Sequence, residues 1–211
     1  MFDWFKKKTG STPEKPNAPE ILGLRLGGAF ELDDLKFRMI EPHLTIEGAS
    51  RTQLIQAVGE VQLDHQTKLL RYYTDDDGYL QVLLHGDGDG GVSEVKLFYF
   101  YETQSIDRED GWNRWLETDL VQPSQQLDGH EFTKVWDNDR PVAMTEKTYH
   151  SNGTLSETDQ FIMLYERDAA PDLAESLLIS CEENFNSGTA ERCVTYITGI
   201  DISPTDFSVI G

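Results

Sequence analysis

The chain has 211 residues, of which 38% are hydrophobic and 27% are charged, a composition typical of one folded domain or two small ones. Its 38 aspartates and glutamates against 18 lysines and arginines give a formal charge of −20. Such a field repels a phosphate backbone, so nucleic acid is excluded as a partner class. The composition also does not fit fibrous or disulfide-rich proteins.

Residues 1–20 differ in composition from the rest of the chain. Prolines recur at Pro13, Pro16 and Pro19, a spacing typical of an extended linker, and four lysines against three carboxylates contrast with the acidic remainder. We therefore predict a flexible tail over residues 1–20 and a single acidic, strand-rich domain over residues 21–211.

The tail begins with aromatic side chains next to lysines. Aromatic groups favour an interface, and lysines favour anionic lipid or an acidic groove of a partner protein. We predict that these residues form a weak docking peptide for a membrane-bound partner or a membrane surface. The alternatives are a tail that packs on its own body and a tail without a role. The residues concerned are Phe2, Trp4, Phe5, Lys6, Lys7 and Lys8.

The compartment is predicted from targeting signals and cysteines. A secretory signal requires positive charge followed by an apolar run, whereas here the lysines follow the first aromatic residues. No apolar stretch approaches the length of a membrane span. Two cysteines are too few for a secreted disulfide framework. We expect a cytoplasmic protein, with peripheral contact to the inner membrane as a variant of this expectation.

The first elements of the domain are ambiguous in type. Apolar residues alternate with other residues up to Leu32, as in a strand, whereas Leu35, Met39 and Ile40 have helical spacing. From Gln53 onward, short period-two apolar runs are separated by Gly, Asn and Asp clusters, which predicts antiparallel hairpins.

The first hairpin is predicted from residues 69–73 and 79–85 around the acidic residues 75–78. A four-residue loop there places Arg71 opposite Val82 and Tyr73 opposite Leu80. Residues 95–101 are expected to form the next strand, with aromatic groups on both faces and cover on both sides.

Two further hairpins follow. Residues 132–136 and 142–149 flank Asn138-Asp139, and Asn152-Gly153 is the strongest tight-turn signal in the chain. The latter turn predicts a register that places Met144 opposite Phe161 and Val142 opposite Met163.

The two cysteines flank a last predicted hairpin. A three-residue loop at residues 186–188 pairs Cys181 directly with Cys193. We interpret them as a buried pair of reduced thiols; the alternative is a redox-sensing pair across two strands.

One helix is predicted over residues 112–121. Trp112, Trp115, Leu116 and Leu120 share one face, and Asp110 is a plausible N-cap. The predicted fold is α+β, mostly antiparallel β as a curved sheet, sandwich or partial barrel, with one or two covering helices.

No complete catalytic, metal or cofactor motif occurs in the sequence. The acidic residues 75–77 and 87–89 lie at opposite ends of one predicted strand and lack the spacing of a calcium loop, so they are interpreted as solvated turns. The aromatic side chains of the predicted strands are compatible with a pocket, and Tyr72, Tyr99 and Tyr101 are the candidates to line it. The alternative is that these side chains form a solid core.

Four segments resemble the YjfK-like family of uncharacterised bacterial proteins. They are residues 23–27, 71–82, 163–167 and 175–179, and the resemblance covers most of residues 21–211. The resemblance implies no activity or site residue. It implies an association with phage-shock-protein-A-like membrane-maintenance partners.

These observations favour a non-enzymatic cytosolic accessory or adaptor protein that binds other proteins, at the membrane face in envelope-stress maintenance. No cofactor is expected. The alternative, from another class, is a small-molecule-binding protein or an enzyme with an aromatic-lined pocket.

Overall fold

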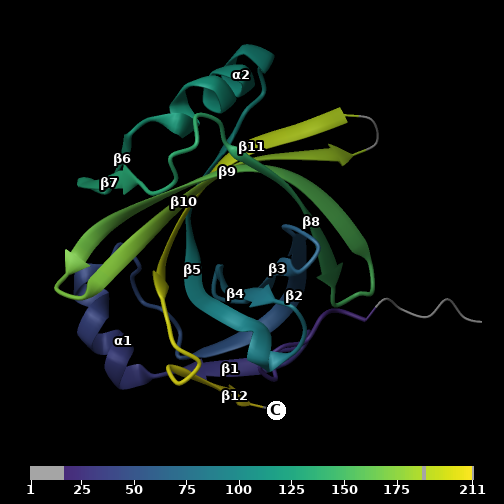
Figure 1. The fold of residues 1–211 in the computed structure, drawn as a ribbon, viewed down its shortest axis with the longest axis vertical. Coiled ribbons are helices and arrows are strands. Elements are labelled where there is room, and N and C mark those ends of the chain that lie inside the picture. Colours follow the sequence, from purple (N-terminus) through teal and green to yellow (C-terminus); the bar gives the residue numbers. More distant parts are fainter. Residues whose placement is uncertain (1–16, 187–188, 211) are drawn as a thin grey trace, which may run out of the picture.

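The computed structural model describes residues 17–186 and 189–210, and β-structure makes up 58% of these residues. Eight antiparallel strands close into a barrel, which Figure 1 shows end-on as a ring. This confirms the prediction of a mostly antiparallel fold with one or two helices, of which the structure has two short ones, and a closed barrel is more specific than the predicted curved sheet, sandwich or partial barrel.

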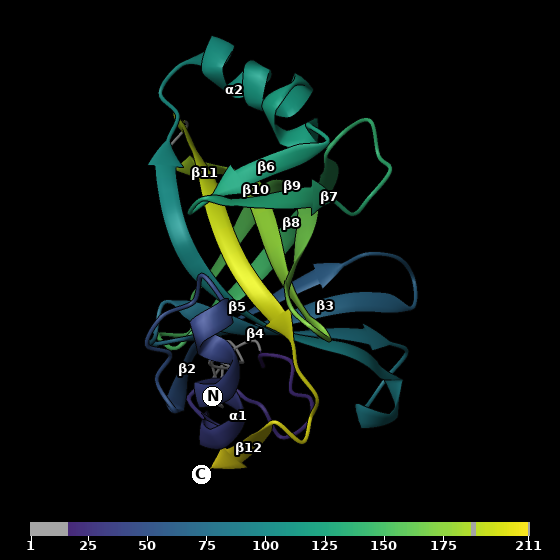
Figure 2. The ribbon, with the colours of Figure 1, turned by 90° about the vertical axis from the view of Figure 1, so that its left-hand side faces the viewer.

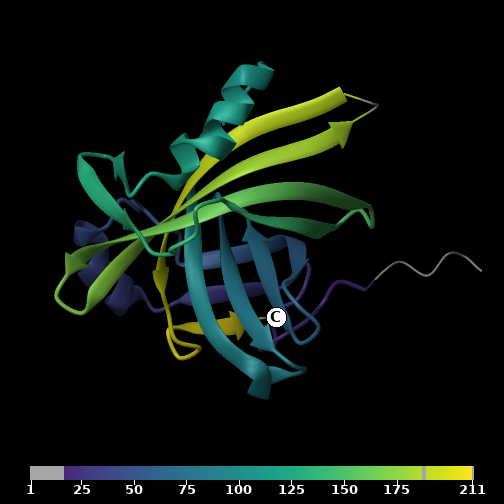
Figure 3. The same cartoon turned by 45° about the horizontal axis from the view of Figure 1, so that its top comes forward.

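The barrel consists of two meanders, each continuous in sequence. The first is β2-β3-β4-β5 and the second is β8-β9-β10-β11. They join where β5 pairs β11 and where β8 pairs β2, and Figure 3 shows them as two facing sheets, blue to teal and green to yellow. The barrel strands are β2 (Thr52–Gln62), β3 (Thr67–Thr74), β4 (Gly78–His85), β5 (Val92–Ser105), β8 (Val142–His150), β9 (Leu155–Ala170), β10 (Leu173–Asn186) and β11 (Thr189–Asp201).

The remaining elements cover the outside of the barrel at opposite ends, as Figure 2 shows. One cover contains β1, α1 and β12, and the other contains α2 and the β6–β7 hairpin. Their bounds are β1 (Ala29–Leu32), α1 (Asp34–Ile40), α2 (Glu109–Glu117), β6 (Ser124–Leu127), β7 (His130–Lys134) and β12 (Phe207–Ile210), with short 3-10 helices at Glu41–His43, Asp89–Gly91 and Asp119–Val121.

Three apolar clusters follow from this arrangement. The outward side chains of β3 and β4, such as Leu70 and Leu80, pack against the first cover. The outward side chains of β9 and β10, such as Met163 and Ile179, pack against the second cover. A third cluster, which includes Phe98, lies inside the barrel. Strands with apolar groups on both faces are therefore covered on both faces.

The ambiguous residues 21–60 contain both a strand and a helix. Asp33 caps α1 by accepting a hydrogen bond from the Lys36 amide (3.0 Å), and Phe37 is the buried residue of the helix. Leu35 and Met39, which suggested the helix, are exposed on its outer side.

The helix predicted over residues 112–121 begins earlier and ends earlier. It spans Glu109–Glu117, and Leu120 follows in a 3-10 turn. Asp110 is not the N-cap: it lies in the first turn, where it pairs with Arg108, the residue before the helix. Trp112, which lies on the predicted apolar face of the helix, is buried.

The predicted hairpin registers are wrong by one residue. Arg71 pairs with Gln81 and Tyr73 with Tyr79, because only the three aspartates 75–77 form the loop and Asp77 takes a positive φ of 50°. A turn followed by one left-handed residue is a common three-residue hairpin loop.

The β8–β9 hairpin deviates in the same way. Met144 pairs with Gln160 instead of Phe161, and Val142 pairs with Ile162 instead of Met163. Residues 151–153 form its loop, in which Gly153 has a φ of 83°. A one-residue shift moves each side chain to the other face of its strand.

The hairpin predicted around Asn138-Asp139 does not form. Among the described residues, β7 pairs with β6 and β9, and β8 pairs with β2 and β9. The turn that precedes β7 is Asp128-Gly129, whose φ values of 50° and 76° suit a tight hairpin turn.

Candidate ligand-binding cavity in the barrel

A cavity of about 420 Å³ lies inside the barrel. Inward side chains of β3, β4, β5, β8, β9 and β10 line it, together with residues 135 and 136, which follow β7. Most of the lining is apolar, for example Leu83, Phe98, Trp136 and Ile162. The volume falls within the range of roughly 300–1,000 Å³ that is usual for small-molecule sites, which are mostly apolar with a few polar groups.

A buried polar network borders the cavity at Arg71. The Arg71 guanidinium donates from Nη1 to Glu146 Oε2 (2.6 Å) and to Gln160 Oε1 (2.8 Å), and from Nε to Gln81 Oε1 (3.0 Å). Tyr73 Oη donates to the other carboxylate oxygen of Glu146 (2.7 Å). Charged groups in a protein interior are stable only when they are paired in this way.

Gly59 provides the space for the Glu146 carboxylate. A Cβ atom at Gly59 would lie 1.7 Å from Glu146 Oε1, so no larger residue fits without displacing it. Burial disfavours the charged form of Arg71, but Glu146 together with Tyr73 and Tyr79 outweighs this, so the pKa of Arg71 is raised. Burial and Glu146 also raise the pKa of Tyr73 well above its ordinary value. The network therefore holds a paired guanidinium and a neutral phenol.

A second charged group lines the cavity around Lys96. Lys96 Nζ lies 2.6 Å from Asp201 Oδ1 and 3.9 Å from Glu166 Oε1, and its side chain is buried. Glu94 lies two residues before Lys96 on β5 and also lines the cavity. Burial raises the pKa of Glu94, and the nearby Asp201 and Glu166 add to this effect against Lys96.

The interior also contains a buried hydroxyl without a partner. Tyr79 Oη makes no hydrogen bond with any described residue, although its side chain is 1% exposed. The Tyr79 ring lies near the Arg71 guanidinium, 5.6 Å from Cζ to the ring centroid, and packs on Phe98. A buried unpaired hydroxyl costs about 1–3 kcal/mol, so a small polar molecule in the interior would stabilise it.

The three tyrosines predicted to line a pocket do not meet in one. Tyr72 points outward from β3 into the apolar cluster beneath the first cover. Tyr99 packs against the same cluster, and Gln53 Nε2 donates to its Oη (3.1 Å). Tyr101 is exposed. The structure instead places an aromatic-containing cavity on the opposite face of these strands.

The six predicted docking residues, Phe2, Trp4, Phe5, Lys6, Lys7 and Lys8, lie outside the described residues.

The predicted direct pairing of Cys181 with Cys193 is wrong. Cys181 pairs with Val194 and Cys193 pairs with Glu182, so the two thiols point to opposite faces of the hairpin. Burial raises the pKa of Cys181 to about 12.

The acidic loops form internal hydrogen bonds. Asp76 accepts from the Ser50 amide (2.7 Å), Asp75 from the Leu54 amide (2.9 Å) and Asp89 from the Leu22 amide (2.8 Å). These carboxylates therefore anchor neighbouring segments. Over residues 17–186 and 189–210, no group of three or more His, Cys, Asp or Glu side chains is arranged to hold a metal ion.

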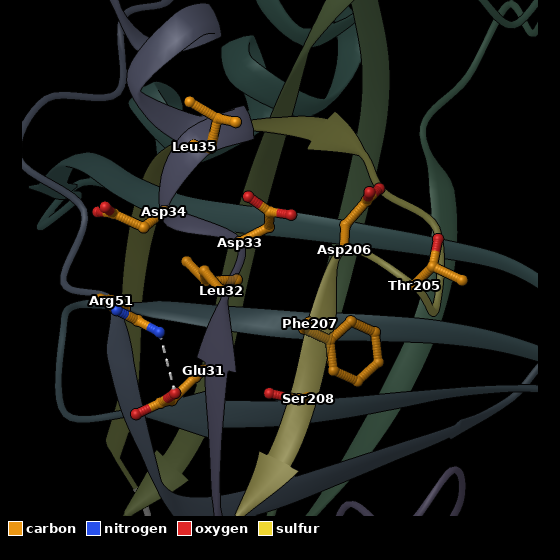
Figure 4. A pocket seen from close by; sticks show the side chains of 10 residues that line it. All are labelled: Glu31, Leu32, Asp33, Asp34, Leu35, Arg51, Thr205, Asp206, Phe207 and Ser208. Atoms are coloured by element: carbon orange, nitrogen blue, oxygen red, sulfur yellow. Dashed lines mark hydrogen bonds and ion pairs between the residues drawn. The ribbon is translucent and has the colours of Figure 1, made fainter.

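A second hollow, of about 390 Å³ and more open, lies between β1, α1 and β12 (Figure 4). Its acidic side chains already have structural roles. Asp33 caps α1, Asp206 accepts from the Ser203 amide (2.6 Å) and pairs with Lys36, and Glu31 pairs with Arg51. This hollow is a weaker candidate than the barrel cavity.

The sequence contains one signal for the barrel cavity, at two basic residues within strands. Arg71 and Lys96 each lie directly between apolar or aromatic neighbours of a strand, where an unpaired charge is costly. Such a residue indicates a buried partner. Its identity, here Glu146 or Asp201, depends on long-range pairing.

The fold and the cavity together define an antiparallel β-barrel protein with a largely apolar interior site. The chain belongs to the family described as "Protein of unknown function (DUF2491)", whose model matches residues 1–208. It is 32% identical over 222 residues to "Uncharacterized protein YjfK" of Escherichia coli (strain K12), with 100% of both chains covered. This confirms the resemblance found in the sequence. No solved structure matches the chain. In the part of the chain that the structure describes, no helix is long and apolar enough to cross a membrane.

Proposed function

We propose that this protein binds a small, mostly apolar molecule inside its barrel. The observation that carries this proposal is the cavity of about 420 Å³, which combines apolar walls with charged side chains. Apolar walls favour binding through burial, at about 25 cal/mol for each Å² removed from water. The few polar groups then select the orientation of the ligand.

The rigidity of the site supports a binding role. The strands that line the cavity each have pairing neighbours on both sides, and the Arg71 network links β3, β4, β8 and β9 from within. A ligand that enters a preformed site loses less binding free energy to ordering of the protein.

The test fills the cavity and measures binding of Nile red, a neutral dye whose emission shifts in apolar surroundings. The variant is Val142→Trp, because Val142 lines the cavity. The matched control is Ala143→Trp, because Ala143 is the next residue of β8 and is exposed. We expect the wild type and Ala143→Trp to bind one dye with a blue shift, and Val142→Trp to lose this binding. Equal binding by all three proteins, or none by the wild type, contradicts the proposal.

We propose a second candidate function, that of an accessory protein that docks through residues 1–8 on a membrane-bound partner or the membrane surface. The supporting observation is the contrast between three consecutive lysines, residues 6–8, and a strongly acidic remainder. Each lysine contributes about 1 kcal/mol near an anionic leaflet, so docking is weak and reversible. Phage-shock-protein-A-like proteins are candidate partners.

The test of this second candidate compares the full chain, a chain that lacks residues 1–8, and a chain in which residues 6–8 are glutamine. Sedimentation with anionic vesicles, and with a phage-shock-protein-A-like protein, measures docking. We expect both altered chains to lose sedimentation while their thermal unfolding stays unchanged. Equal sedimentation of all three chains refutes the docking role.

A further inference from the structure

We propose that the barrel cavity selects a cationic amphipath: a molecule with an apolar body for the cavity and an ammonium group for the carboxylates around Lys96. This inference rests on the proposed binding function and specifies its ligand class.

The lining itself contains two basic side chains, Arg71 and Lys96, and two acidic ones, Glu94 and Glu166, but the ion pairs around it shift this balance. Arg71 is neutralised by Glu146, 2.6 Å away, so this pair adds no net charge. Lys96, by contrast, is the only cation among the described residues whose ion pairs reach Asp201 and Glu166. With Glu94, three carboxylates lie near one ammonium: Glu94 and Glu166 line the cavity, whereas Asp201 lies outside the lining with a 64% exposed side chain.

Glu94 is the carboxylate of this group that lacks a partner. Within the described part of the chain it makes no ion pair and no hydrogen bond, although it lines the cavity. Burial raises its pKa, and the nearby charges of Asp201 and Glu166 raise it further. A ligand ammonium at this position would relieve the repulsion between the carboxylates and gain a charge-assisted hydrogen bond.

The apolar walls define the rest of the ligand. Leu69, Leu83, Ile162 and Leu164 line the cavity and can bury an alkyl or ring body. Trp136 lines the same cavity, and an indole face attracts an ammonium group. The formal charge of −20 on the whole chain also attracts cations and repels anions over long range.

The experiment measures the affinity of the full chain for three probes that differ only in their polar end: decylamine, decanol and decanoate, at pH 7. Tryptophan fluorescence and calorimetry report binding. We expect decylamine to bind about tenfold or more tightly than the other two, since a charge-assisted hydrogen bond contributes enough for a factor of this size. Added salt should weaken decylamine binding and leave decanol binding unchanged.

Variants locate the ammonium site. Glu94→Gln should weaken decylamine binding about tenfold without changing decanol binding. The matched control is Glu102→Gln, because Glu102 is an exposed residue of the same strand, β5, outside the cavity. It should change neither affinity.

The outcomes separate this inference from the proposed function. If decanol or decanoate binds as tightly as decylamine, or if Glu94→Gln binds decylamine like the wild type, the cationic ligand class is wrong and the binding cavity stands. If none of the three probes binds, the proposed function itself fails, and the inference fails with it. Thermal unfolding of both variants establishes that they are folded before binding is measured.

Discussion

The ion pair between Arg71 and Glu146 gives the most direct test of how the barrel interior is stabilised. The two side chains are only 3% and 2% exposed, and the Nη1–Oε2 distance is 2.6 Å. Glu146→Leu leaves the Arg71 charge in the interior without its carboxylate. Removing one partner of a buried pair costs about 3–5 kcal/mol, because the remaining charge has lost both water and its partner.

The double variant Arg71→Met/Glu146→Leu removes both charges. Replacing a buried pair by apolar groups of similar volume is often nearly neutral, so we expect the double variant to recover most of the loss. At about 2–4 °C of melting temperature per kcal/mol for a chain of this size, Glu146→Leu should lower the Tm by roughly 6–20 °C.

The assay is urea unfolding, followed by tryptophan fluorescence, of the wild type, the two single variants and the double variant. Arg38→Gln is the control, because Arg38 pairs with Asp34 on the surface of α1 and should change the free energy of unfolding by no more than about 0.5 kcal/mol. A Glu146→Leu loss below about 1 kcal/mol, or a double variant whose loss equals the sum of the single losses, would refute the reasoning.

Three other predictions follow from the same structure. Gly59→Ala should destabilise the fold by about 1–3 kcal/mol in urea unfolding, because the added Cβ atom would overlap the Glu146 carboxylate. The control, Gly111→Ala in α2, should stabilise the fold by about 0.5–1 kcal/mol, because a methyl group fits there. Burial raises the pKa of Glu182 above 4.5, so this carboxyl group ionises at a lower pH in the unfolded chain than in the folded one, and the stability of the fold falls as the pH rises past 4.5. Glu182→Gln should therefore raise the Tm at pH 7 and leave it unchanged below about pH 4. Cys181 should resist a thiol reagent at pH 8 in the native protein and react once the protein is unfolded, since burial raises its pKa to about 12; rapid native labelling at this residue would contradict the buried position.

Strand positions could be read from the sequence because they depend on local patterns. Period-two apolar runs placed β3, β4, β5 and β8 within a few residues of their bounds. The registers could not be read, because they depend on how many residues each loop contains. Asp77 and Gly153 adopt left-handed conformations that close three-residue loops, and the sequence does not distinguish these from loops one residue longer or shorter.

Because the predicted β3–β4 register was wrong by one residue, the sequence did not reveal the candidate site. With Arg71 opposite Val82, its neighbours would be apolar, whereas the true partner Gln81 is part of the polar network. Glu146 joins this network through the pairing of β8 with β2, which connects segments about 90 residues apart. No local pattern encodes such a pairing, so both the closure of the barrel and the cavity required the structure.

The construction of the barrel from two meanders has a consequence for how the chain folds. Each meander contains only contacts between neighbouring strands in sequence, so each can form early, whereas the two seams, β5 with β11 and β2 with β8, join distant segments and are expected to form last. Arg71 belongs to one meander, and Glu146 and Gln160 belong to the other. Until the seams form, each half exposes one side of this charge pair to water. The final assembly step therefore requires the two halves to lose their water together. An offset of one residue at the β2–β8 seam would bury the Arg71 guanidinium and the Glu146 carboxylate without bringing them into contact.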